Sequence, residues 1–121
     1  MNRFAGLIGL AVLAAALAVP ALTAPAWADD AAVEATYGGY HRAIRAAELC
    51  EDRAFDQDAQ AKMAGVIDEK IHHAIGAGRR LVLIDEAKSE VDKLVADKDC
   101  TEASVQEALA LFHGDLEPAL Q

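Results

Sequence analysis

Two adjacent histidines, His72 and His73, are the residues best suited to metal chemistry in this sequence. Asp68 precedes His72 by four residues, and Glu69 precedes His73 by four. On a helix each pair shares a face, so an imidazole nitrogen and a carboxylate oxygen could bind one divalent transition metal ion. Further ligands would have to come from another helix. Metal binding at these four residues is therefore an alternative to histidines that are solvated or hydrogen-bonded to nearby carboxylates.

A second candidate for chemistry is the glycine- and arginine-containing stretch from Gly76 to Arg80. Backbone N–H groups at the start of the helix expected there, together with Arg79 and Arg80, could bind a phosphate or carboxylate group. The alternative is that both arginines complement the negative end of the preceding helix. The phosphate-loop pattern G-x-x-x-x-G-K-[ST] does not occur in the sequence, nor does G-x-G-x-x-G.

Nucleophilic catalysis finds little support. Ser89 lies among charged residues without a histidine at local spacing, and Ser104 is placed to cap a helix. General acid–base catalysis needs a carboxyl group that is desolvated, whereas the acidic residues mostly occupy outward positions of the expected helices. The sequence therefore predicts a protein that is not an enzyme and needs no cofactor, unless the metal alternative holds.

The two cysteines, Cys50 and Cys100, are predicted to form a structural disulfide bond. An even number of cysteines in an exported chain favours pairing, and the C-x-x-C spacing of redox and zinc sites is absent. Closing a loop of about 50 residues is worth roughly 4 kcal/mol in the chain-entropy model. For a small domain this is a large share of the free energy of unfolding.

Four helices are expected to position these residues, which predicts an all-α, four-helix bundle fastened by the Cys50–Cys100 disulfide. Apolar residues recur at spacings of three and four, and no strand-like alternation competes with them. The predicted inward faces are Tyr40, Ile44, Ala47, Cys50 and Ala54; Met63, Val66, Ile67, Ile71, Ala74 and Ile75; Leu81, Ile84, Ala87, Val91, Leu94 and Val95; and Val105, Ala108, Leu109, Phe112 and Leu116.

Local residue types also predict the ends of these helices. The first helix is expected to follow Gly38-Gly39, and Asp56 or Asp58 is expected to cap the second. Gly76 is expected to end the second helix with a positive φ, which glycine adopts at little cost. Residues 104–107 have the S-x-x-E pattern of a capping box, which predicts the start of the fourth helix.

The N-terminus has the features of a cleaved signal peptide. A positive n-region that contains Arg3 precedes an apolar run, and Ala26-Trp27-Ala28 fits a signal peptidase site. We therefore predict a signal peptide over residues 1–28, a flexible segment over 29–36 and a helical domain over 37–121, located in the periplasm or secreted. The alternative, an uncleaved anchor, would need a longer apolar run than the one before Pro20.

The net charge of the chain excludes some classes of partner. The 121 residues carry a net charge of −9, and removal of the signal peptide takes away Arg3 and no acidic residue. Such a chain repels nucleic-acid phosphates and anionic lipid, so neither nucleic acid nor the membrane surface is expected as a partner after cleavage. A protein partner or client is the class of partner that the charge does not exclude. No feature predicts an oligomeric state.

The cysteine frame resembles that of the small periplasmic acid-stress chaperones. Cys50-Glu51-Asp52, a second cysteine fifty residues later at Cys100, and one further helix carry the resemblance. It implies an all-α protein with one disulfide that exposes a client-binding surface at low pH. The chain differs from that family because it is more acidic and lacks both the tryptophan before the first cysteine and the lysine-rich tail. The function expected is a non-enzymatic, exported helical protein that binds or protects another macromolecule under envelope stress.

Overall fold

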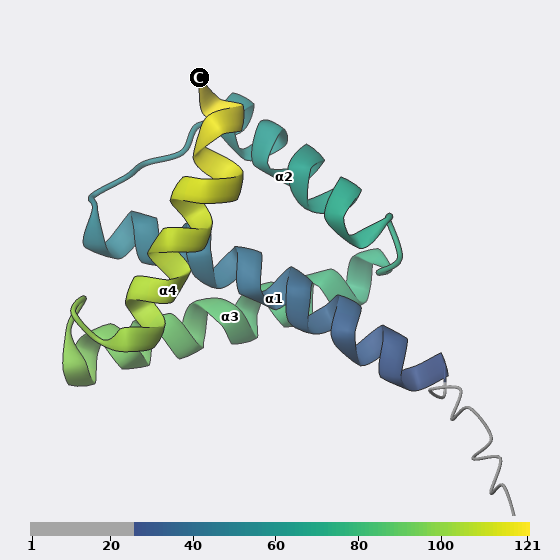
Figure 1. Cartoon of the computed structure of the whole chain (residues 1–121), viewed down its shortest axis with the longest axis horizontal. Helices are drawn as coiled ribbons and strands as arrows, with labels where there is room; N and C mark the ends of the chain where they lie inside the picture. The colour runs from purple at the N-terminus through teal and green to yellow at the C-terminus, as the bar shows by residue number, and fades with distance from the viewer. Residues whose placement is uncertain (1–25) are drawn as a thin grey trace, which may run out of the picture.

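The computed structural model describes residues 26–121, which are helical and contain no strand (Figure 1). The elements are α1 (Ala26–Cys50), α2 (Gln57–Ile71), α3 (Ala77–Lys98), α4 (Ala103–Leu111), a π-helical turn η1 (Phe112–Leu116) and a 3₁₀ turn η2 (Glu117–Leu120). The predicted all-α fold with four helices is therefore confirmed. The predicted signal peptide lies almost wholly outside the described residues. In the described part, none of the helices combines the length and apolarity that a bilayer span requires.

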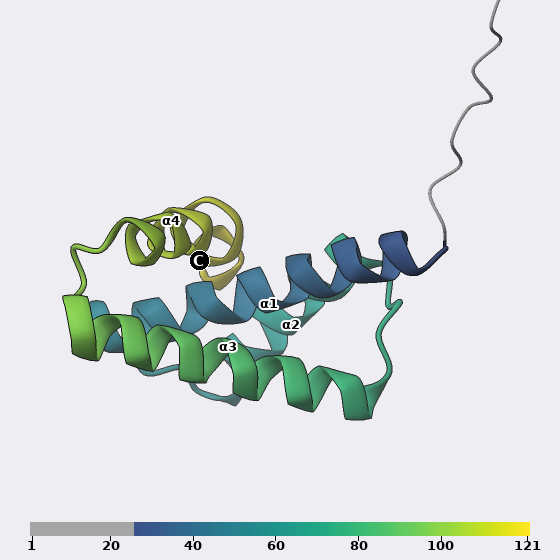
Figure 2. The same cartoon turned by 90° about the horizontal axis from the view of Figure 1, so that it is seen from below.

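Helices α1 and α3 run side by side in the same direction, with α2 as the return connection (Figures 1 and 2). Three ion pairs join them at similar sequence offsets of 45, 48 and 47 residues: Glu34–Arg79, Arg42–Glu90 and Arg45–Asp92. Because these pairs are largely exposed, solvent screens them, and their main effect is to fix the register of the two helices.

The predicted disulfide is present and extends the same register. Cys50, the last residue of α1, bonds to Cys100 just after α3, across a sequence separation of 50 residues and a Cα–Cα distance of 5.8 Å. The bond therefore fastens the C-terminal ends of the two parallel helices to each other. It also places the α1–α2 connection and the start of α4 at one end of the molecule.

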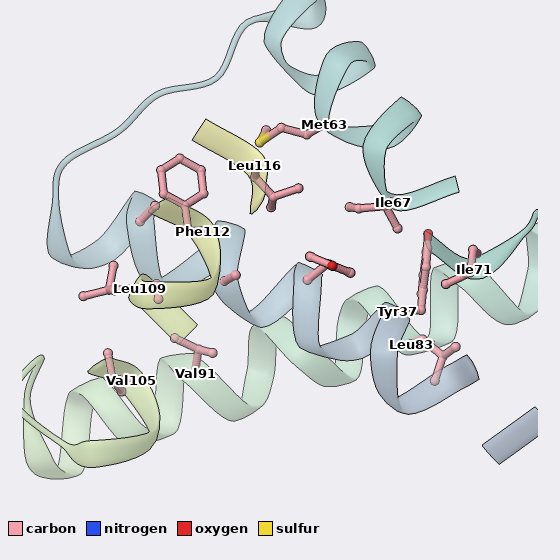
Figure 3. Packing of buried hydrophobic residues seen from close by; sticks show 14 of the residues in the cluster. Tyr37, Met63, Ile67, Ile71, Leu83, Val91, Val105, Leu109, Phe112 and Leu116 are labelled. Atoms are coloured by element: carbon pink, nitrogen blue, oxygen red, sulfur yellow. The ribbon is translucent and has the colours of Figure 1, made fainter. Parts of the chain in front are cut away.

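Small residues along α1 let the other helices approach it closely. Ala43, Ala46 and Ala47 have no exposed surface, and Gly38 is also buried. Around this stripe lie the large core residues shown in Figure 3, among them Met63, Ile71, Val91, Val105, Phe112 and Leu116. Helix α1 is thus the central element, and its C-terminal half contacts α3 and α4 together.

Several helix ends differ from the predictions. Helix α1 begins at Ala26 and passes through Gly38-Gly39, so the expected start after these glycines is wrong. Residues 29–36, predicted as a flexible segment, are helical in the structure. The cap of α2 is confirmed, because the Asp56 carboxylate accepts a hydrogen bond from the Ala59 N–H at 2.8 Å. The cap of α4 is Glu102 rather than Ser104, since its carboxylate accepts hydrogen bonds from the next backbone N–H groups.

The end of α2 also differs from the prediction. Helix α2 ends at Ile71, and His72 and His73 adopt the left-handed conformation with φ of 53° and 54°. Gly76, expected to take this conformation, has φ −68° and is the N-cap of α3. The turn brings Ile75 into the core with 8% of its surface exposed. On α3 the predicted inward position of Leu81 is wrong, because 66% of its surface is exposed and Leu83 is buried instead.

Candidate functional site

A pocket lies between α2 and the parallel pair of α1 and α3. Within residues 26–121, α2 packs against α1, η1 and η2, and it is joined to α3 by the side chains of Asp68 and Arg80 rather than by close approach of the two backbones. In Figure 1 α2 diverges from α1 towards the C-terminal turns. The pocket has a volume of about 740 Å³ and is partly open to solvent. It is therefore the candidate functional site.

The pocket surface is mainly apolar and comes from all three helices and the α1–α2 connection. Its apolar residues include Ile44, Phe55, Met63, Ile67 and Ile84. Met63 and Ile67 also belong to the hydrophobic core, whereas Ile44, Phe55 and Ile84 are partly exposed. The pocket is thus an open extension of the core, and apolar material bound there would be removed from water.

The carboxylates that line the pocket are each paired with an arginine. Arg80 Nη1 donates to Asp68 Oδ1 at 2.6 Å, and Arg80 Nε donates to the Ile75 carbonyl at 2.7 Å. Glu48 accepts a hydrogen bond from Arg45 Nη1 at 3.0 Å. The Arg80–Asp68 bond links α3 to α2, and each of the two carboxylates has its charge balanced by an arginine.

A third guanidinium belongs to a cluster at the disulfide end. Arg53 donates to Glu117 Oε2 at 3.1 Å and lies 5.1 Å from the centre of the Phe112 ring. His113 bridges Glu117 and Glu51, with 2.7 Å from each ring nitrogen to a carboxylate oxygen. The two carboxylates, first Glu51 and then Glu117, raise the pKa of His113. This cluster ties the C-terminal turns to the residues that follow Cys50.

His41 is the ionisable residue most affected by the pocket. Its ring lies against Tyr37, with 4.6 Å between ring centroids. Burial, reinforced by the positive charges of Lys88 and Arg80, lowers the pKa of His41 from 6.5 to about 4. At neutral pH its imidazole is therefore uncharged. We did not select His41 or Lys88 from the sequence. The signal that could have found them is a polar residue four positions along a helix from an apolar residue of the inward face.

The four residues of the predicted metal site do not have the expected helical arrangement. Because α2 ends before His72 and His73, neither histidine shares a helix face with an acidic residue. The shortest approach is 3.8 Å, from His73 Nδ1 to Asp68 Oδ2, and Glu69 and both histidines are exposed. Over residues 26–121 no group of three or more histidine, cysteine, aspartate or glutamate residues is arranged to bind a metal ion.

The two arginines of the predicted anion site are both in ion pairs. Arg79 donates two hydrogen bonds to the Glu34 carboxylate, at 2.7 and 2.8 Å. Arg80 is bonded to Asp68 as described above. Arg79 thus joins α3 to α1 and Arg80 joins α3 to α2, so the structure does not bring the two guanidiniums together on one anion.

Comparison of the chain with protein-family models, with curated proteins and with solved structures finds no match. The geometry of the pocket and the charges around it are therefore the basis for the function proposed below.

Proposed function

We propose that this chain is a non-enzymatic binding protein that acts after export, and that the pocket between α1, α2 and α3 holds the apolar part of its partner. The observation that supports the proposal is the pocket of about 740 Å³, lined mainly by apolar residues and partly open to solvent. This volume lies within the range of roughly 300–1,000 Å³ typical of ligand sites.

The energetics of packing also support binding. Protein interiors are normally close-packed, and unfilled apolar space lowers stability because the surrounding groups lose contacts. In a small domain, apolar side chains such as Ile44 and Ile84 would be better buried by a closer approach of α2. The ion pair between Asp68 and Arg80 instead links α2 to α3 in its diverging position. An open pocket held in this way suits a protein that buries a partner there.

Protection of other proteins under envelope stress would use the same pocket. The carboxylate of Glu117 has its pKa lowered by hydrogen bonds from His113 and then Arg53. The stabilisation from these bonds is present at neutral pH and is lost as the pH falls through the lowered pKa. Acid would therefore weaken the attachment of the C-terminal turns, against which α2 packs, while the disulfide keeps α1 and α3 together. More apolar surface would become accessible to an unfolding client.

A neutral, environment-sensitive dye such as Nile red tests the proposal on the full chain at about pH 7. Ala64 lies on the pocket surface and is exposed, so Ala64→Trp would fill the pocket without removing a core contact. Ala110→Trp on α4, outside the pocket, is the matched control. We expect binding of one dye per chain, lost in Ala64→Trp and kept in Ala110→Trp. No dye binding by the native chain, or equal binding by both variants, would contradict the proposal.

The stress-protection part needs an aggregation-prone client protein, mixed with the chain between about pH 2 and pH 7. We expect suppression of client aggregation that strengthens on acidification and is weaker in Ala64→Trp than in Ala110→Trp. Suppression that Ala64→Trp leaves unchanged would place client binding elsewhere. Absence of suppression across the whole range would remove the chaperone function while leaving ligand binding to be judged by the dye.

A further inference from the structure

The pocket carries a local charge opposite to that of the whole protein. Three cationic residues, Arg53, Arg80 and Lys88, and two carboxylates, Glu48 and Asp68, line it, which leaves one positive charge at neutral pH. The protein as a whole has a net charge of −9. A cationic position in so acidic a chain therefore distinguishes the pocket from the surrounding surface.

The unbalanced charge is that of Lys88. Arg80 is bonded to Asp68, Arg53 to Glu117, and Glu48 to Arg45. No ion pair involves Lys88 among the residues that the structure describes. Its side chain extends from α3 one turn after Ile84, and both line the pocket. The ammonium group is thus available to a ligand beside an apolar surface.

His41 faces the same pocket from α1. Its imidazole packs on Tyr37, and among the described residues its ring nitrogens make no hydrogen bond to the protein. Lys88 is close enough to His41 to be the second cause of its lowered pKa, after burial. A ligand that supplies a negative charge between these two side chains would accept hydrogen bonds from the ammonium group and from the N–H group of the imidazole.

We propose that the pocket binds an amphipathic monocarboxylate, with its aliphatic chain on Ile44 and Ile84 and its carboxylate between Lys88 and His41. This inference rests on the proposed binding function and adds the chemical class of the ligand. An aliphatic cation would be repelled by Lys88, and a neutral alcohol would leave the ammonium group without a countercharge. The carboxylate balances the charge of Lys88, and the aliphatic part of the ligand covers the apolar surface.

Binding of a carboxylate in this pocket should change the protonation of His41. The charged and titratable groups that line this pocket are Tyr37 and Glu48 on α1, Arg53 on the connection, Asp68 on α2, and Arg80 and Lys88 on α3. A bound carboxylate adds a negative charge next to His41 and so favours its imidazolium form. We expect the pKa of His41 to rise when the ligand binds.

Three probes with the same ten-carbon chain separate the contributions: decanoate, decanol and decylammonium. Their affinities for the full chain are measured by calorimetry or by displacement of Nile red. We expect decanoate to bind roughly tenfold more tightly than decanol, the size of one charge-assisted hydrogen bond, and decylammonium to bind most weakly. In Lys88→Gln the advantage of decanoate should disappear while the affinity for decanol stays the same.

Lys93→Gln, on α3 outside this pocket, is the control and should leave all three affinities unchanged. Proton NMR of His41, with and without decanoate, reports the expected rise in pKa. Equal binding of decanoate and decanol, or an unchanged His41 pKa with decanoate bound, would refute the proposal that the ligand is a carboxylate. The proposal that the pocket binds apolar groups would not be affected. If none of the probes binds and Nile red also fails to bind, the proposed function falls together with the inference.

Discussion

Replacement of His41 by phenylalanine should remove part of the acid sensitivity of the fold. Phenylalanine keeps a flat ring next to Tyr37 but cannot accept a proton. In the folded protein the pKa of His41 is lowered from 6.5 to about 4. Between these two pH values the unfolded chain binds a proton that the folded chain does not bind, so stability falls as the pH falls from 6.5 towards 4.

The size of the effect follows from the shift. Each pKa unit corresponds to about 1.4 kcal/mol, so a shift from 6.5 to about 4 sets a ceiling of roughly 3 kcal/mol. Because the ring is partly exposed, solvent screening reduces this, and we expect about 2 kcal/mol. The native chain should therefore lose about 2 kcal/mol more than His41→Phe between pH 7 and pH 4.5.

Urea denaturation followed by circular dichroism at the two pH values measures this difference. His113→Gln is a control of opposite sign: the raised pKa of His113 stabilises the fold below pH 6.5, and this contribution is lost as the pH rises through the folded-state value. His113→Gln should therefore lose more stability at low pH than at high pH, relative to the native chain. If His41→Phe lost as much stability on acidification as the native chain, the reasoning about His41 would be refuted.

Three further outcomes are expected. Cys100→Ala should lower the free energy of unfolding by about 2–5 kcal/mol, and an unchanged melting temperature would contradict a structural disulfide. Gly39→Ala should stabilise the protein by about 0.5–1 kcal/mol, because α1 passes through this position and the added Cβ meets only ordinary contacts; no gain in a melting curve would contradict a continuous helix. Mass spectrometry and metal analysis of protein recovered without an affinity tag should find a chain that begins at Asp29 and no stoichiometric metal, because over residues 26–121 no group of ligands is arranged around His72 or His73. An intact leader would contradict the first expectation, and a stoichiometric metal bound through His72 or His73 would contradict the second.

The helices and the disulfide could be predicted from local patterns because they depend on local periodicity and on chemistry common to exported proteins. Leu109, Phe112 and Leu116 recur at spacings of three and four, and the structure buries all three. Cys50 and Cys100 needed no spatial information to be paired, since each was the only partner of the other.

The helix ends could not be predicted because they depend on tertiary contacts. The Gly38-Gly39 pair predicted a helix start, but α1 passes through it because the buried residues on both sides, Tyr37 and Tyr40, pack against the rest of the core. The turn after α2 depends on Arg80, which bonds to the Ile75 carbonyl and to Asp68, 5 and 12 residues away. These bonds and the burial of Ile75 offset the roughly 1–2 kcal/mol that a left-handed conformation costs a residue other than glycine.

The candidate site was missed for the same reason. His41 and Lys88 lie on two helices far apart in the sequence, and only the parallel arrangement of α1 and α3 places them on one pocket. The predicted metal site assumed that α2 continued through His73, whereas the helix ends at Ile71. A pocket formed by the divergence of one helix leaves no motif in the sequence.

The most direct test of the account is an NMR measurement of where decanoate contacts the full chain, with labelled isoleucine and leucine methyl groups. Ile44 and Ile84 line the pocket, whereas Leu81 lies on α3 with 66% of its surface exposed outside it. We expect nuclear Overhauser effects from the decanoate chain to the Ile44 and Ile84 methyl groups and none to Leu81. Contacts to Leu81 without contacts to either isoleucine would contradict it.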